Sequence, residues 1–283
     1  MGIMYKKMLA AVNEHVNSEV SARYALDLAR TTGSKLYLCF VAEKDTSKAA
    51  FEHAEGAAKR LFLRAKEMDV SVESIFATGH PVREIQKIVR SENIDIVFAA
   101  TRHKDVSKRF YEGTVARELS LSLTCSVALV RIVHMGRIHP RKILVPLKAR
   151  MGHISETAYF TALCSRAFDS RVYLFHSAKP ITRFFHGELN LTQVEWEEKI
   201  PGDIALFVGT LDTYGVAHEK KLLPGKTGRN ITIEAAVRRH DLIIMGASER
   251  GLVSSLLRGN PVEEVLRDTP CNLIILKLRH EDT

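Results

Sequence analysis

Cysteine is scarce in this sequence, and a long apolar segment is missing. The 283 residues include four cysteines, none of which forms a CxxC pair: Cys39, Cys125, Cys164 and Cys271. All four lie in or beside apolar runs, which predicts buried free thiols rather than a disulfide framework or a zinc site. No apolar run approaches the about 18 residues that a membrane-spanning helix needs. The start, MGIMYKKML, lacks a signal-peptide pattern, so we expect a cytoplasmic protein with no membrane span.

The common catalytic and metal-binding signatures are missing as well. The chain contains no GxSxG, no HExxH and no set of kinase motifs, and its 12 histidines show no ligand spacing. The PGKT at 224–227 resembles the end of a Walker A loop, but Lys220 stands where that loop needs its first glycine. The sequence therefore gives little support for an enzyme, and we expect no catalytic residues and no metal site.

The charge is positive but scattered. Lysine and arginine number 41 against 33 acidic residues, which gives a net charge of +8. The densest basic cluster is Arg102, Lys104, Lys108 and Arg109, interrupted by Asp105. No basic helix with interleaved aromatics and no RNA-binding signature accompanies it. This pattern favours a solvated surface, while binding to nucleic acid or to an anionic surface stays open as an alternative.

An internal repeat organises the chain. Residues 241–278 contain an apolar run, a polar loop, a glycine that opens a helix, and a cysteine before a second apolar run. Residues 95–132 show the same order. Asp241, Gly259 and Cys271 each stand 146 positions after their counterparts Asp95, Gly113 and Cys125. Three landmarks in one register predict a duplicated domain.

Each half alternates apolar strands with amphipathic helices. In the first half we expect strands at 7–12, 35–42, 70–76, 94–99 and 126–132, with intervening helices at 49–68 and 82–91 and from 114, and a helix capped by Asn17 or Ser18. In the second half we expect strands at 142–146, 171–177, 218–223, 242–245 and 272–278. This order predicts an α/β fold with two similar open, mostly parallel five-stranded sheets flanked by helices. With 134–140 as the linker, the expected domains are 1–133 and 141–283.

The chain resembles the universal stress protein family in its tandem two-domain form. The resemblance rests on KILVP at 142–146, on GHPVREI at 79–85, and on MGASERG, LLRGNPVEEVL and TPCNLIILK between 245 and 277. It implies an adenine-nucleotide alpha-hydrolase-like fold, a stress-response or regulatory role, and ATP or AMP as ligand with at most slow hydrolysis. It also implies an intramolecular pseudo-dimer, with a further homodimer as an open question.

Nucleotide-binding members of that family carry Gly-x2-Gly-x9-Gly-Ser/Thr after the fourth strand and an Asp after the first. The second half keeps the outer glycines, Gly246 and Gly259, but has Glu249 and Asn260 at the other two positions. The first half keeps Gly113-Thr114 but has Ala100 and His103 at the first two glycine positions. The Asp position holds Asn13 in the first half and Lys148 in the second. The resemblance therefore implies degenerate sites.

We expect any nucleotide in the second half, at the carboxyl ends of the strands, where ligands of open parallel sheets bind. Backbone N–H groups at a helix start suit phosphate, and glycine lets the backbone approach it closely. The expected site residues are Pro146, Lys148, Gly246, Ala247, Ser248, Arg250, Gly259, Asn260 and Pro261.

A ligand-free interpretation of the same residues is equally open. Asn260 is a good helix N-cap, Pro261 suits the first turn, and Glu263 completes a pattern like a capping box. Three hypotheses therefore stand: an adenine-nucleotide binder, a protein-interaction module with an unknown protein partner and no nucleotide, and a nucleic-acid or anionic-surface binder.

Overall fold

The structure, a computed structural model, describes residues 4–101, 114–136, 138–178, 201–224, 227–247 and 261–279. The chain divides into two compact units. The first unit contains residues 1–138 and 275–283, and the second contains residues 139–274. Within the described ranges, no helix is both long enough and apolar enough to cross a membrane.

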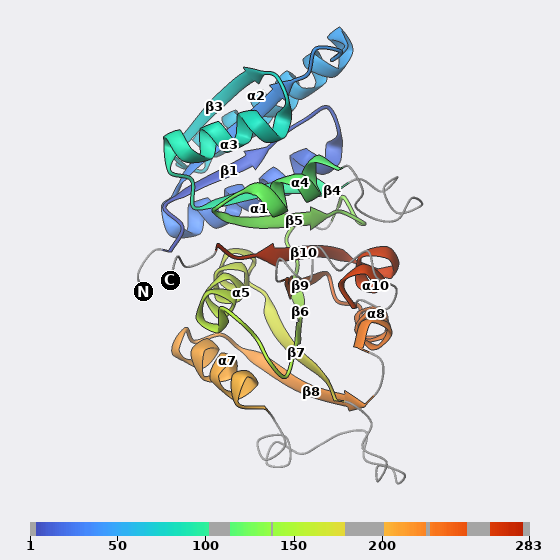
Figure 1. The fold of residues 1–283 in the computed structure, drawn as a ribbon. Coiled ribbons are helices and arrows are strands. Elements are labelled where there is room, and N and C mark those ends of the chain that lie inside the picture. The colour runs from blue at the N-terminus through green and yellow to red at the C-terminus, as the bar shows by residue number, and fades with distance from the viewer. Residues whose placement is uncertain are drawn as a thin grey trace. The chain divides into compact units, whose positions relative to one another are not determined.

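The first unit alternates strands and helices along the chain (Figure 1). Its elements are β1 (Lys7–Ala11), α1 (Val16–Thr32), β2 (Lys35–Ala42), α2 (Lys48–Glu67), β3 (Val72–Thr78), α3 (Pro81–Glu92), β4 (Ile96–Thr101), α4 (Val115–Ser122) and β5 (Ser126–Arg131). The strands lie in the order β3-β2-β1-β4-β5 and pair in parallel. The carboxyl ends of β1 and β4 are therefore neighbours, since Met8 of β1 pairs with both Leu36 and Ile96.

The second unit repeats this arrangement. Its elements are β6 (Lys142–Leu147), α5 (Ile154–Phe168), β7 (Arg171–Ala178), α7 (Gly202–Thr213), β8 (His218–Pro224), α8 (Thr227–Val237), β9 (Leu242–Gly246), α10 (Pro261–Asp268) and the first part of β10 (Asn272–Lys277), whose residues from 275 onward are counted with the first unit. The order is β10-β9-β6-β7-β8, and β6 pairs in parallel with β7 and β9. The expected α/β class, with largely parallel strands flanked by helices, is confirmed.

Two strands of the first unit begin later than the sequence pattern predicts. The pattern places strand starts at Val70 and Ile94, whereas β3 begins at Val72 and β4 at Ile96. Both residues are buried, but their backbone N–H groups donate to Ala65 O and Val89 O of the preceding helices, at 2.9 and 3.0 Å. The two residues therefore close a helix before the strand starts.

Helix α1 begins earlier than its expected cap at Asn17 or Ser18. The helix starts at Val16, and His15 is the N-cap residue without a side-chain capping bond. The side chain of Asn13 bends the chain first, because its Oδ1 accepts a hydrogen bond from His15 N at 3.0 Å. Ser18 Oγ accepts one from Asn13 N at 2.9 Å, so Ser18 fastens the turn from inside the helix.

The prediction for the cysteines is confirmed. All four are free and buried. Burial raises the pKa of the Cys39 thiol to about 12. Burial is also the main cause that raises the pKa of Cys125 to about 12. Thiols held in their protonated form are poor nucleophiles.

Candidate functional site

A cavity of about 650 Å³ opens at the carboxyl ends of the first unit's central strands. It lies where β1 leads into α1, where β2 leads into α2, and where β4 ends beside the start of α4. Asn13, Ala100 and Thr114 all line it. This is the place where open parallel sheets bind ligands, and the volume suits a small molecule of nucleotide size.

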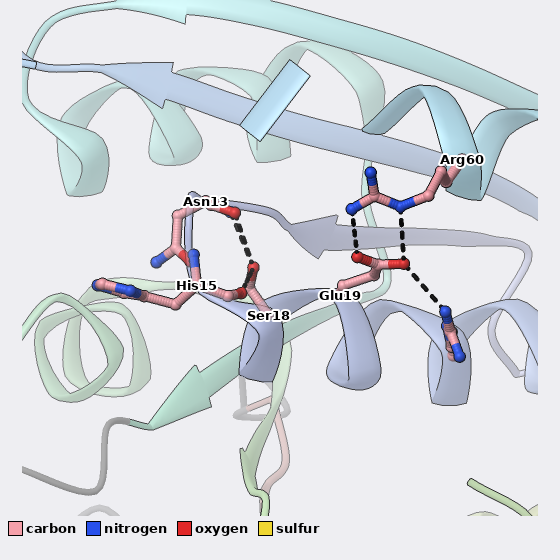
Figure 2. A network of polar contacts seen from close by, with 6 residues as sticks. Asn13, His15, Ser18, Glu19 and Arg60 are labelled. Atoms are coloured by element: carbon pink, nitrogen blue, oxygen red, sulfur yellow. Dashed lines mark hydrogen bonds and ion pairs between the residues drawn. The ribbon is translucent and has the colours of Figure 1, made fainter. Parts of the chain in front are cut away.

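Asn13 lines this cavity, and the oxygen of its side-chain amide already accepts a hydrogen bond within the turn after β1 (Figure 2). Its Oδ1 can only accept the hydrogen bond from His15 N, so the assignment of oxygen and nitrogen in the amide is fixed. Its Nδ2 has no hydrogen-bond partner among the described residues. Asn13 therefore offers a ligand a donor, where the carboxylate expected from the family resemblance would offer an acceptor.

The described lining of the cavity is acidic. Four carboxylates contribute to it and no lysine or arginine among the described residues does: Glu14, Glu43, Asp45 and Glu118. The start of α4 also caps itself, because Thr114 Oγ1 accepts a hydrogen bond from Arg117 N at 3.3 Å. Glu118 adds negative charge to the first turn of this helix. The described lining therefore attracts phosphate weakly.

Glu43 and Asp45 were not recognised from the sequence as lining residues. They follow β2, about thirty positions after Asn13, and only the parallel pairing of β1 with β2 brings the two segments together. Thr46 Oγ1 accepts a hydrogen bond from Glu43 N at 2.8 Å and folds this loop. The run EKDTSK after an apolar strand was the available signal.

A carboxylate network lies beside the cavity, between α1 and α2 (Figure 2). Glu19 is buried, with 8% of its side chain exposed, and accepts hydrogen bonds from Arg60 Nη2 at 2.8 Å and Arg23 Nη2 at 3.0 Å. Burial alone would raise the pKa of Glu19, but the hydrogen bonds and charges of the two arginines together lower it. The network joins the two helices.

The second-unit site residues that the structure describes lie at the expected strand ends. Pro146 lies near the end of β6, and exposed Lys148 follows that strand. Gly246 ends β9 and is exposed, Ala247 is 9% exposed, and Pro261 opens α10. β6 and β9 are paired neighbours, so their carboxyl ends lie at one edge of the sheet. Ser248, Arg250, Gly259 and Asn260 lie outside the described residues.

The space beside the backbone of Gly246 has room for a side chain. A Cβ added there would meet only the side chain of Thr157, at 4.0 Å. The φ of Gly246 is not in the left-handed region, unlike that of Gly79. Gly246 would therefore help a ligand by letting it approach the backbone closely, and not by adopting an unusual backbone conformation.

Within the described ranges, no group of three or more His, Cys, Asp or Glu side chains could hold a metal ion. This finding covers His15 and Glu14, whose side chains are 3.2 Å apart in the turn after β1.

Comparisons with known proteins agree on the family. The model of the universal stress protein family matches residues 4–131 and 141–277. A universal stress protein of Archaeoglobus fulgidus shares the fold, with a TM-score of 0.66 and 16% identity over 98% of this chain and 97% of its own. A universal stress protein from Thermus aquaticus, described as lying in the QAH/OAS sulfhydrylase 3' region, is 23% identical over 129 residues, which are 44% of this chain and 90% of its own.

Other members of the family have been solved with a bound nucleotide. One is a universal stress protein from Archaeoglobus fulgidus in complex with dAMP, which matches 48% of this chain at 18% identity with a TM-score of 0.36. Because the family model matches twice and the two matches together cover nearly the whole sequence, this chain belongs to the universal stress protein family and contains two copies of its domain.

Proposed function

We propose that this protein is a stress-response regulator that binds an adenine nucleotide, AMP or ATP, at a degenerate site in the second unit. The phosphates would lie at the carboxyl end of β9 and at the start of α10, held by Gly246, Ser248, Arg250, Gly259 and Asn260. Pro146, Lys148, Ala247 and Pro261 would complete the site. The protein would have no more than slow hydrolytic activity.

The observation that carries the proposal is the open backbone at Gly246. This residue ends β9 and is exposed. A Cβ added to it would lie 4.0 Å from the Thr157 side chain, so the space beside its backbone is free of close neighbours. Lys148, exposed after the neighbouring strand β6, adds a positive charge on the same edge of the sheet. Both features favour a phosphate.

The charge of the first-unit cavity supports the same choice. That cavity has the size for a nucleotide, but its described lining carries four carboxylates and a helix start that is already capped by Thr114. Ala100 stands there in the position that corresponds to Gly246, so a side chain occupies the close-approach point. Phosphates bind less well against negative charge.

A matched pair of variants tests the proposal by calorimetry with AMP and ATP. Gly246→Leu places a bulky side chain at the second-unit site, and Ala100→Leu places the same one at the corresponding first-unit position. We expect Gly246→Leu to abolish binding and Ala100→Leu to leave it unchanged. The same contrast is expected between Gly259→Leu and Gly113→Leu. Circular dichroism confirms that each variant is folded.

The opposite results have distinct meanings. Loss of binding only in Ala100→Leu would place the nucleotide in the first-unit cavity and overturn the choice of unit. The absence of any binding to the wild-type protein would overturn the nucleotide proposal and favour the protein-interaction hypothesis. Binding of DNA or RNA with a steep salt dependence would favour the third hypothesis.

A further inference from the structure

Six of the helices that the structure describes end in the same way. The residue after the last turn is in the left-handed conformation, and the N–H of the next residue returns to a carbonyl five positions back. The donors of these closing bonds are Ser34, Val70, Ile94, Ser170, Val216 and His240. At α8, Arg239 has a φ of 53° and His240 N donates to Ala235 O at 2.9 Å.

At five of the six closing positions the residue is buried before the following strand, and Val216 is half-buried. Val70 and Ile94 are apolar and each 4% exposed. The two buried serines are satisfied, since Ser34 Oγ donates to Tyr5 O and Ser170 Oγ donates to Pro140 O. This position therefore takes an apolar side chain or a polar one with a partner.

His240 meets neither condition. Its side chain is 1% exposed, and neither Nδ1 nor Nε2 has a hydrogen-bond partner among the residues that the structure describes. Its ring lies edge-on to Tyr173 of β7, with ring centroids 4.8 Å apart and an interplanar angle of 65°. The corresponding residue of the first unit, 146 positions earlier, is Ile94. An imidazole thus occupies a site that the first unit fills with an aliphatic side chain.

The charged groups around His240 come from three elements, and its carboxylate neighbours already have partners. Glu234 on α8 accepts a hydrogen bond from Lys221 Nζ and pairs with Arg238 at 3.1 Å. Asp241, just before β9, accepts bonds from the backbone N–H groups of Arg141 and Lys142. Lys142 of β6 and Arg238 of α8 add positive charge.

A proton on His240 would therefore be poorly compensated. Burial is the largest cause that lowers the pKa of His240, with Lys142 and Arg238 acting in the same direction and Glu234 and Asp241 opposing them, and the result is about 4. The folded pKa is depressed below the ordinary value of 6.5. Stability that is present above pH 6.5 is therefore lost as the pH falls toward 4.

We propose that His240 is an acid-sensitive switch: its protonation releases the joint between α8 and β9 and so opens the second unit. Opening in acid would loosen β9, the strand that ends at Gly246. Control of ligand binding at that residue rests on the proposed function, whereas the opening itself does not.

Hydrogen exchange of the full chain without ligand tests the switch. Protection factors, corrected for the intrinsic pH dependence of exchange, are compared at pH 7 and pH 4.5 for peptides from 227–247 and for the corresponding 81–101 segment. Between pH 7 and pH 4.5, a pKa of 6.5 in the open state and one of about 4 in the closed state limit the loss of protection in 227–247 to about 60-fold. We expect a loss of at least about tenfold there and little change in 81–101.

Two substitutions exchange the closing residues of the two units. His240→Ile copies the first unit and should remove the acid-dependent loss in 227–247. Ile94→His should install such a loss in 81–101. His240→Gln, which keeps a polar side chain that does not titrate, should also lack the pH dependence if it is folded at pH 7. An unchanged pH dependence in folded His240→Ile or His240→Gln would overturn the proposal, whether or not the protein binds a nucleotide.

Discussion

The ion pairs of Glu19 should contribute measurably to the stability of the first unit. Glu19 Oε2 accepts a hydrogen bond from Arg60 of α2 at 2.8 Å, and Oε1 accepts one from Arg23 of α1 at 3.0 Å. Glu19 is buried, but 62% of the Arg60 side chain is exposed. Removing Arg60 therefore leaves Arg23 as a partner of the buried carboxylate, while replacing the carboxylate by an amide removes the charge that attracts both arginines.

The expected magnitudes follow from this asymmetry. A hydrogen bond to a charged group contributes about 1.5–3 kcal/mol when buried, and an exposed ion pair contributes under about 1 kcal/mol. We therefore expect Arg60→Ala to lower the free energy of unfolding by about 1 kcal/mol and Glu19→Gln to lower it by about 2 kcal/mol. Because the arginines lower the pKa of Glu19, the contribution is present above its ordinary value of 4.5 and is lost as the pH falls through the lowered pKa.

Urea unfolding at pH 7 and at pH 3, followed by circular dichroism, measures these changes. Arg64→Ala is the matched control, because Arg64 is an exposed arginine of the same helix with no ion-pair partner among the described residues. It should change the free energy of unfolding by under about 0.5 kcal/mol. Equal effects of Arg60→Ala and Arg64→Ala would refute the assignment of stability to the Glu19 pair, and so would a Glu19→Gln effect that is the same at both pH values.

Two further predictions concern thiols and helix packing. The four buried cysteines should resist a thiol reagent in the native protein at pH 8, since burial raises the pKa of Cys39 and Cys125 to about 12; rapid labelling of either would contradict their burial. Gly228→Ala should lower the free energy of unfolding by about 1–3 kcal/mol, because its Cβ would overlap Glu264 Oε2 and lie 2.9 Å from Glu264 Cβ. Glu264→Ala should relieve much of that loss, and no relief would show that the crowding has another source.

The repeat and the apolar runs were enough to predict the fold. β2 matches its expected range because its apolar residues from Leu36 to Phe40 are continuously buried, as a strand covered on both faces requires. Apolar character could not give the starts of β3 and β4. Val70 and Ile94 are as buried as strand residues, but their N–H groups belong to the preceding helices. Hydrophobicity does not report where a backbone hydrogen bond goes.

The candidate site was less accessible to sequence reasoning. The family motif directed attention to the loop after the fourth strand of each half. The acidic lining from Glu43 and Asp45 depends on the pairing of β1 with β2, which no local sequence pattern predicts. The state of the Asn13 amide likewise depends on the turn that it forms with His15. The charge of the site and the orientation of its hydrogen-bond donors therefore depend on the tertiary structure and cannot be predicted from local sequence.

The most direct test of the central claim is native mass spectrometry of the protein purified without added ligand, followed by titration with AMP and ATP. We expect the wild-type protein to carry or take up one adenine nucleotide, Gly246→Leu to take up none, and Ala100→Leu to behave like the wild type. A wild-type protein that neither retains a nucleotide nor takes up AMP or ATP would contradict the claim.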